Sequence, residues 1–242
     1  MLVFASFYAD LPDRPSRARE FLPFVTAGAR ALAATTPHAT YVLLTDARTA
    51  PHFDKHVRTM IVAPDDAPLM LKYMMAQREY LRTAVAQVAD VSVLADTDNV
   101  PNRDLTNACH PDHSVAVTHK GSKFGRRINN LAFVRDPAMA GWFLDKAIAT
   151  LGTMPAEKAD WLGDQESWEA VLGSPTRWLK LTGDTFAAPV DDRFIHVYPC
   201  DTHNCPVPRQ GGMKKIQKNA FVLHFKGPRK AHLDAFMAER FA

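Results

Sequence analysis

Short apolar runs alternate with longer helix-forming segments through residues 1–100 of this 242-residue chain. Each run has the length of a strand and is followed by polar or turn-forming residues. We therefore predict strands at residues 2–8, 41–45, 59–63 and 91–96, and helices at residues 17–34 and 69–88. Strands that alternate with helices fold into a mainly parallel α/β sheet with helices packed on its faces. Ligands bind such sheets beyond the carboxyl ends of the strands, so functional residues are expected there.

The rest of the chain has a more mixed texture, with shorter strands between polar loops. Strands are predicted at residues 114–118, 129–134, 178–181, 186–189, 194–198 and 221–225. Helices are predicted at residues 136–150, 159–172 and 230–240, and loops at residues 99–113 and 199–219. Because there is no internal repeat or low-complexity segment, we expect one domain with a continuous sheet.

The composition excludes several classes of protein. The formal net charge is only +3, with 47% hydrophobic and 23% charged residues, which gives no basis for a nucleic-acid partner. No stretch approaches the roughly 18 apolar residues of a membrane span. Cys109, Cys200 and Cys205 are too few and too scattered for a disulfide framework, and the first residues lack the basic start of a signal peptide. We therefore expect a cytoplasmic protein.

Residues 91–101, VSVLADTDNVP, form an apolar run that ends in two aspartates, Asp96 and Asp98. Residues i and i+2 of a strand point to the same side, so both carboxylates project together from the strand end. Two like charges that close repel each other, and a cation between them relieves the repulsion. Oxygen ligands suit Mg²⁺ or Mn²⁺. The alternative is that these aspartates only terminate the strand.

A second candidate lies near the end of the chain, in residues 224–230, HFKGPRK. His224 at a strand end can offer an imidazole nitrogen to a metal. Gly227 allows backbone amides to approach a phosphate closely, and Arg229 and Lys230 add positive charge where a helix begins. Lys226 belongs to the same basic turn. The alternative is a core histidine followed by a solvated basic turn.

Together these segments resemble a known family, the metal-dependent GT-A glycosyltransferases. The resemblance is greatest to the retaining group that includes the lipopolysaccharide galactosyltransferases and glycogenin. That group has an arginine on a helix, then a D-x-D motif roughly 17–20 residues later, and an H-x-x-G-x-x-K motif near the C-terminus. Here Arg78 lies in AQREYL, Asp96 and Asp98 follow, and residues 224–230 match the last motif.

The resemblance implies a Rossmann-like mixed sheet, with a nucleotide-binding half at residues 1–100 and an acceptor half at residues 101–242. It implies transfer of a sugar from a nucleotide-diphosphate sugar, UDP being the expected nucleotide, to a hydroxyl of a saccharide, lipid-linked or protein acceptor. Asp96, Asp98 and His224 would hold Mn²⁺ or Mg²⁺. In the same two motif segments, the resemblance implies further contacts with the nucleotide-sugar donor from Thr97, Lys226, Gly227, Arg229 and Lys230.

Further donor contacts follow from the resemblance. Arg78 would contact the donor sugar or its diphosphate, although a surface salt bridge with Glu79 is the alternative. Ala5, Phe7 and Tyr8 would line the base pocket, where an aromatic ring can stack on the base, unless these rings are core.

Three more residues are implied beside the donor sugar. Asp164 and Gln165 would lie next to its anomeric carbon as the catalytic pair, although an aspartate at a helix start also serves as an N-cap. Asn130 resembles an asparagine of the family. The family has glycine at the next position, and this chain has Leu131.

Two other classes of function remain open. The segment around Asp96 and Asp98 also fits the D-x-D-x-[TV] signature of haloacid-dehalogenase-type phosphatases, with Asp96 as nucleophile and Asp98 as general acid/base. That signature normally sits on the first strand, whereas three strands precede it here. A non-catalytic nucleotide-sugar binder is the other alternative.

Several polar segments have no firm assignment. The loops at residues 120–127 and 209–218 are basic and contain glycine. The second loop, with Gly211 and Gly212, can close over a diphosphate or lie solvated on the surface. The CDTHNC segment at residues 200–205, with His196 nearby, and the CHxxH segment at residues 109–113 offer irregular zinc ligands.

Overall fold

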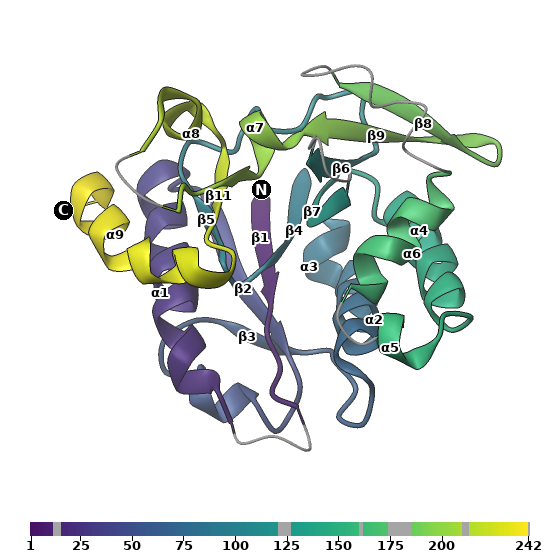
Figure 1. The fold of residues 1–242 in the computed structure, drawn as a ribbon, viewed down its shortest axis with the longest axis horizontal. Helices are drawn as coiled ribbons and strands as arrows, with labels where there is room; N and C mark the ends of the chain where they lie inside the picture. Colours follow the sequence, from purple (N-terminus) through teal and green to yellow (C-terminus); the bar gives the residue numbers. More distant parts are fainter. Residues whose placement is uncertain (12–15, 121–126, 160–161, 174–184, 210–212, 242) are drawn as a thin grey trace.

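The computed structural model describes residues 1–11, 16–120, 127–159, 162–173, 185–209 and 213–241 (Figure 1). The strands are β1 (Leu2–Phe7), β2 (Ala39–Thr45), β3 (Thr59–Ile61), β4 (Val91–Asp96), β5 (Asn99–Pro101), β6 (Val115–Lys120), β7 (Arg127–Val134), β8 (Phe186–Val190), β9 (Arg193–Pro199), β10 (Cys205–Pro206) and β11 (Val222–His224). They form an eight-stranded sheet in the order β3-β2-β1-β4-β7-β6-β9-β8 and a three-stranded sheet in the order β10-β11-β5.

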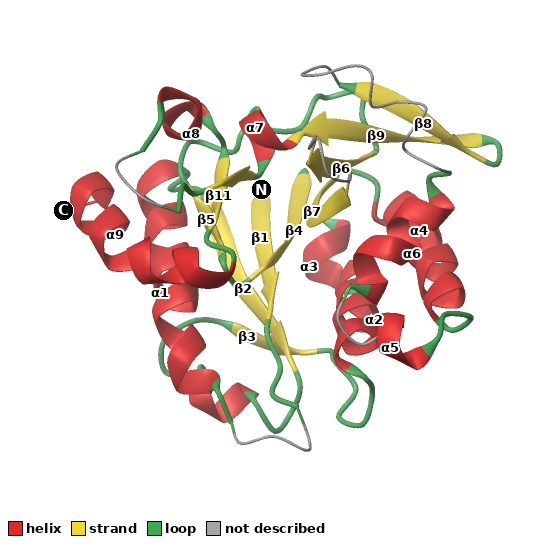
Figure 2. Cartoon of the chain, viewed as in Figure 1, coloured by secondary structure: helices red, strands yellow, loops and turns green. Residues whose placement is uncertain are grey.

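Helices cover this framework on both sides (Figure 2). They are α1 (Ala18–Thr35), α2 (Leu69–Leu81), α3 (Ala84–Gln87), α4 (Pro137–Leu151), α5 (Ala156–Ala159), α6 (Gly163–Val171), α7 (Cys200–His203), α8 (Lys215–Asn219) and α9 (Leu233–Phe241), with 3₁₀ turns η1 (Ala50–His52) and η3 (Gly227–His232).

The large sheet is mixed and mainly parallel. β1 pairs in parallel with both β2 and β4, and β2 pairs in parallel with β3. β7 is antiparallel to both of its neighbours, β4 and β6, and β9 is parallel to β6 but antiparallel to β8. The predicted fold class, a mainly parallel α/β sheet flanked by helices, is confirmed.

Both faces of the central strands are buried, which explains their unbroken apolar sequences. On one face, Val3 and Ala5 of β1 pack in a core with residues of α2, α4 and α6. On the other face, Leu2 and Phe4 pack in a second core that includes Leu32 of α1. Alternate side chains of one strand therefore enter two different cores, as the pleat requires.

The small sheet packs against α1 and α9, on the left in Figure 1. Val100 of β5 and Leu223 of β11 share a core with Phe24 of α1 and Phe236 of α9. β5 and β11 pair antiparallel, with Asn99 opposite His224. The end of the chain is thereby brought beside the residues that follow β4.

Some sequence predictions need correction. The predicted loop at residues 99–113 begins with strand β5, whose Pro101 is tolerated because it ends a short strand at a sheet edge. The helix predicted at residues 69–88 is divided into α2 and α3. The division comes at Thr83, whose hydroxyl caps α3 by accepting from the backbone N–H of Ala86.

Other differences concern the C-terminal half. α7 and α8 lie within the predicted loop at residues 199–219, and the final helix starts as the 3₁₀ turn η3 before α9. The helix predicted at residues 159–172 corresponds to α6, which begins later, at Gly163, and ends at Val171. The strand predicted at residues 178–181 lies outside the described residues.

Candidate metal and diphosphate site

Asp96 is the last residue of β4 and lies at the carboxyl edge of the parallel strands. It is opposite Phe7, the last residue of β1, in the parallel pairing of the two strands. Thr97 is buried at 4% exposure, and the chain turns there so that Asp98 comes directly before β5. The two carboxylates therefore lie where ligands of parallel sheets collect.

The small sheet adds a third side chain to the two aspartates. Because Asn99 pairs with His224, the imidazole comes beside Asp98, and Nε2 of His224 is 3.2 Å from Oδ1 of Asp98. One ligand atom from each of Asp96, Asp98 and His224 can be chosen so that all three lie within 4.8 Å of one another. The structure thus gathers residues that are more than 120 positions apart in sequence.

The basic turn after β11 reaches the same cluster. Nζ of Lys230 is 3.5 Å from Oδ2 of Asp98 and 4.1 Å from the ring centre of Phe21 on α1. Gly227 has φ of +59°, in the left-handed region that favours glycine. The Nε atom of Arg229 is buried and has no hydrogen-bond partner among the described residues. The turn therefore places the ammonium group of Lys230 beside Asp98, on a backbone that depends on Gly227.

Asp96 bears the electrostatic cost of this gathering. Burial raises the pKa of Asp96 well above its usual range, and the charges of Asp98 and Asp164 raise it further. Lys226 and Lys230 offset only part of this effect. The charged form of Asp96 is therefore the form that a nearby cation would stabilise most.

Asp98 behaves in the opposite way. Burial raises its pKa, but the charges and close contacts of His224 and Lys230 lower it more, to about 2. Asp98 is consequently held as a carboxylate by the protein's own cations.

The cluster has the chemistry of a site for a hard divalent cation. Two carboxylates and an imidazole supply oxygen and nitrogen ligands that suit Mn²⁺ or Mg²⁺. Oδ1 of Asp98 is buried and makes no well-directed hydrogen bond, despite its proximity to His224. These residues fit either metal.

Asp164 and Gln165 lie in the first turn of α6 and are buried, at 1% and 7% exposure. The negative charge of Asp164 is one of the causes that raise the pKa of Asp96. The N-cap of α6 is Leu162, which excludes the N-cap role for Asp164. Asp164 is therefore a buried carboxylate whose charge acts on Asp96.

The aromatic residues at the end of β1 are part of the core. The ring of Phe7 contacts Tyr73 edge-on, with centroids 5.2 Å apart. Tyr8 packs against Phe21 with a centroid distance of 4.6 Å, and its hydroxyl donates to Asp10. Ala5 is 1% exposed between neighbouring strands. These contacts agree with core packing, and the face of Tyr8 toward Phe21 is covered.

Arg78 does not join the cluster. It lies on the outer side of α2, where its guanidinium pairs with Asp145 of α4 and, at 3.0 Å, with Glu79. It lines a pocket of about 330 Å³ together with Trp142 and other residues of α2, α3 and α4. The surface salt bridge is therefore the arrangement that the structure shows.

The side chain of Asn130, on β7, lies outside the described residues. The same holds for most of the basic loop at residues 120–127 and for residues 210–212 of the other basic loop. Among the described residues, only Asp96, Asp98 and His224 bring three candidate ligand atoms together, so the cysteine segments form no zinc cluster there. The three cysteines are buried and form no disulfide bond with one another.

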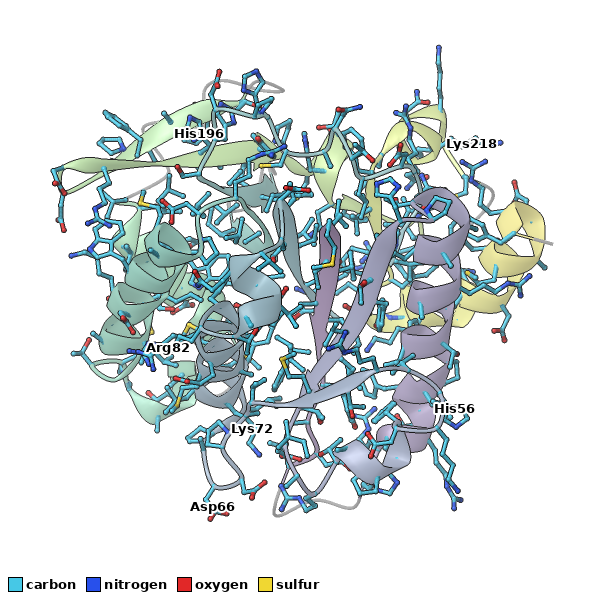
Figure 3. All side chains as sticks on the ribbon, turned by 180° about the vertical axis from the view of Figure 1, so that it is seen from behind. His56, Asp66, Lys72, Arg82, His196 and Lys218 are labelled. Atoms are coloured by element: carbon cyan, nitrogen blue, oxygen red, sulfur yellow. The ribbon has the colours of Figure 1, made fainter. Side chains whose placement is uncertain are left out.

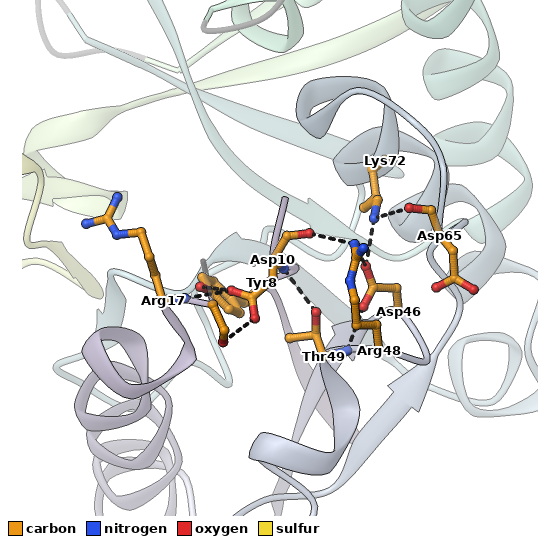
Figure 4. Close-up of polar contacts among 9 residues, drawn as sticks. Tyr8, Asp10, Arg17, Asp46, Arg48, Thr49, Asp65 and Lys72 are labelled. Carbon is orange, nitrogen blue, oxygen red and sulfur yellow. Dashed lines mark hydrogen bonds and ion pairs between the residues drawn. The ribbon is translucent and has the colours of Figure 1, made fainter. Parts of the chain in front are cut away.

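A buried polar network at the ends of β1 and β2 has no counterpart in the sequence predictions (Figure 4). Lys72 of α2 pairs with Asp46 at 2.7 Å, and both side chains are 0% exposed. Lys72 also donates to the backbone oxygen of Asp65, and the Thr49 hydroxyl accepts from the backbone N–H of Asp10. Asp46 directly follows the apolar strand β2, much as Asp96 ends β4. An aspartate in that position is the sequence signal that could have indicated a buried ion pair.

A stacked histidine pair lies at the far end of the large sheet from Lys72 (Figure 3). The rings of His113 and His196 are 3.5 Å apart and inclined by 10°. Nδ1 of His113 lies 2.8 Å from the hydroxyl of Tyr198. The pKa of His113 is lowered from 6.5 to about 4. Burial is the main cause, and the neighbouring His196 and His110 add to it. The folded state therefore disfavours protonation at this position.

This pair predicts acid sensitivity. The unfolded chain takes up a proton on His113 below about pH 6.5, and the folded chain does so only near about pH 4, so the free energy of unfolding falls between these values. His113→Asn retains a polar group near Tyr198 without a titratable group. We expect its melting temperature to fall less than that of the wild type between about pH 7 and about pH 4.5. His56→Asn, at an exposed position, is the control, and identical pH profiles for wild type and His113→Asn would contradict the prediction.

Comparison with known structures places this fold among glycosyltransferases. A glycosyltransferase involved in the glycosylation of the major capsid of PBCV-1 superposes with a TM-score of 0.58 and 13% identity, over 96% of this chain and 98% of that chain. The glycosyltransferase GlyE of Streptococcus pneumoniae TIGR4 superposes with a TM-score of 0.53 and 11% identity, over 93% of this chain and 55% of that chain. No family model matches the sequence, and no curated protein does. At these identities the likeness establishes the shared fold.

No helix in the described parts of the chain combines the length and the apolar character that a membrane crossing demands.

Proposed function

We propose that this chain is a metal-dependent GT-A glycosyltransferase that moves a sugar from a nucleotide-diphosphate sugar to an acceptor hydroxyl. The observation that carries the proposal is the convergence of Asp96, Asp98 and His224 within 4.8 Å at the carboxyl edge of the sheet. Lys230, 3.5 Å from Asp98, adds a cation for a diphosphate. The shared fold with two glycosyltransferases supports the same class.

The proposed chemistry follows from charge. Asp96, Asp98 and His224 would hold Mn²⁺ or Mg²⁺, which when bound would neutralise negative charge on the departing nucleoside diphosphate. Lys230 and Arg229 would bind the same phosphates, and Gly227 would allow close backbone approach. We propose UDP as the nucleotide and the residues before Asp98 as the nucleotide-binding half, with the remainder as the acceptor half.

The sugar would lie near Asp164, because the charge of this buried carboxylate acts on Asp96. Asp164 and Gln165 would orient the anomeric carbon, which gains oxocarbenium character as the bond to the diphosphate breaks. A carboxylate there, together with the resemblance to the galactosyltransferase and glycogenin group, favours retention of configuration. The acceptor would be a saccharide, a lipid-linked sugar or a protein.

The contacts of Asp98 favour the transferase over the phosphatase. A general acid must hold a proton, whereas His224 and Lys230 keep the pKa of Asp98 at about 2. His224 and the basic turn also have a role in the transferase and none in the phosphatase.

Thermal stabilisation tests the proposal. At a concentration of about 100 times Kd, UDP with Mn²⁺ is expected to add about 2.7 kcal/mol to the free energy of unfolding, which raises the melting temperature by about 5–10 °C. EDTA should remove most of this shift, because the diphosphate is held partly through the metal. A shift that is unchanged by EDTA would overturn the metal-dependent site. Release of UDP from UDP-sugars then separates an enzyme from a non-catalytic binder.

A further inference from the structure

Tyr73 of α2 is only 2% exposed and packs at the end of β1. Its ring meets the ring of Phe7 at 74°, with centroids 5.2 Å apart. Phe7 is the residue opposite Asp96 in the pairing of β1 with β4. Strand register and ring packing therefore both direct Tyr73 toward Asp96.

The hydroxyl of Tyr73 lies near two carboxylates. It is in hydrogen-bonding contact with Asp96, and the charges of Asp96 and Asp164 both act on it. A tyrosine hydroxyl carries its proton at neutral pH, so it is a hydrogen-bond donor toward the carboxylate of Asp96. Gln77, one turn further along α2 and 0% exposed, is another neighbour of the hydroxyl.

A carboxylate on a strand end needs such a donor to serve as a rigid ligand. The terminal torsion of aspartate is broad, so an unheld carboxylate turns freely. A hydrogen bond to one oxygen restricts this rotation and leaves the other oxygen for a metal. Residues that hold ligands in this way typically change metal affinity about 10- to 100-fold when they are mutated.

We infer that Tyr73 is a positioning residue that orients Asp96 for metal binding. This inference rests on the metal site of the proposed function.

The test is Tyr73→Phe, which removes the hydroxyl and keeps the ring against Phe7. Binding of Mn²⁺ is measured by electron paramagnetic resonance of the free ion, and binding of Ca²⁺ by competition. We expect the Kd for Mn²⁺ to rise about 10- to 100-fold. The Kd for Ca²⁺ should rise much less, because Ca²⁺ accepts irregular ligand geometry.

Tyr80→Phe is the matched control. Tyr80 is on the same helix and 0% exposed, and its hydroxyl lies 2.9 Å from Oγ of Ser92, in a contact that includes none of the three ligands. Its Mn²⁺ affinity should match that of the wild type. The ratio of Mn²⁺ to Ca²⁺ affinity does not depend on the fraction of folded molecules, so a moderate loss of stability does not obscure the result.

Phe7→Leu supplies a second variant if Tyr73→Phe does not fold. It keeps the hydroxyl and removes the ring that supports it, so a smaller loss of Mn²⁺ selectivity in the same direction is expected. If Tyr73→Phe has the wild-type ratio of Mn²⁺ to Ca²⁺ affinity, the role of Tyr73 is overturned and the metal site is not. The same holds for Phe7→Leu if Tyr73→Phe does not fold. A wild-type protein that binds no Mn²⁺ would overturn the proposed metal site, and the inference with it.

Discussion

Asp96→Asn is expected to reduce metal-dependent sugar transfer by about 10³-fold, while it raises the melting temperature of the metal-free protein. A bound metal contributes several kcal/mol of charge stabilisation in the transition state, and each 1.36 kcal/mol is tenfold in rate. The stability gain has a separate cause. Burial and the charges of Asp98 and Asp164 disfavour the charged form of Asp96, as its raised pKa shows, and asparagine removes that charge.

The sign of the pH dependence follows from the same shift. A carboxyl whose pKa is raised by folding destabilises the folded state increasingly as the pH rises from its unfolded pKa toward its folded pKa. The stability difference between Asp96→Asn and wild type should therefore grow with pH and shrink in acid. Calorimetry across pH, with and without Mn²⁺, measures it.

Asp112→Asn is the control for this substitution, because Asp112 is an exposed aspartate in a surface loop. It should leave both transfer and melting temperature at wild-type values. Full activity in Asp96→Asn would exclude Asp96 as a metal ligand. Loss of activity together with a lower melting temperature would point to a damaged fold instead.

Lys72→Met is expected to lower the free energy of unfolding by about 3–5 kcal/mol, because it leaves Asp46 as a buried charge without its main partner. Lys72 and Asp46 are both 0% exposed and 2.7 Å apart. Burial alone raises the pKa of Asp46, and the hydrogen bonds from Lys72 and Thr49 reverse this, so that the pKa ends below its usual value. Urea denaturation measures the loss.

The double variant Lys72→Met with Asp46→Asn separates the ion pair from simple packing. Asparagine removes the buried charge and retains an oxygen for the backbone N–H of Thr49, which donates to Asp46 at 2.8 Å. The double variant should therefore recover most of the lost stability. Lys55→Met, at an exposed lysine, should change stability little. If the double variant were as unstable as Lys72→Met, the loss would lie in packing and not in the unpaired charge.

The central strands were predictable because both of their faces are buried. Residues 2–8 and 91–96 are apolar without interruption, and the structure places alternate side chains of β1 in two separate cores. The short strands β5 and β10 and the short helices α7 and α8 could not be predicted in this way. They are too brief to show a period, and they form because the small sheet packs against α1 and α9.

Arg78 shows where spacing along the chain is insufficient. Its distance from Asp96 in sequence agrees with the family pattern, yet the rotation of α2 turns it toward Asp145 of α4. Tyr73 and Gln77, on the buried face of the same helix, are the residues that approach the site. Which face of a helix meets the sheet depends on packing against all its neighbours, and no single motif records it.

By itself, the sequence determined the α/β class of the fold, because strand-length apolar runs and helices alternate. It also placed Asp96 and Asp98 on one side of a strand end, because the side-chain period of a strand is two. Only the tertiary structure decided that His224 and Lys230 meet Asp98, since this depends on the antiparallel pairing of β5 with β11 across more than 120 residues. It also decided that Tyr73, and not Arg78, packs against Phe7, the residue opposite Asp96 in the strand pairing. Such contacts arise from strand pairing and helix rotation, which act between distant segments of the chain.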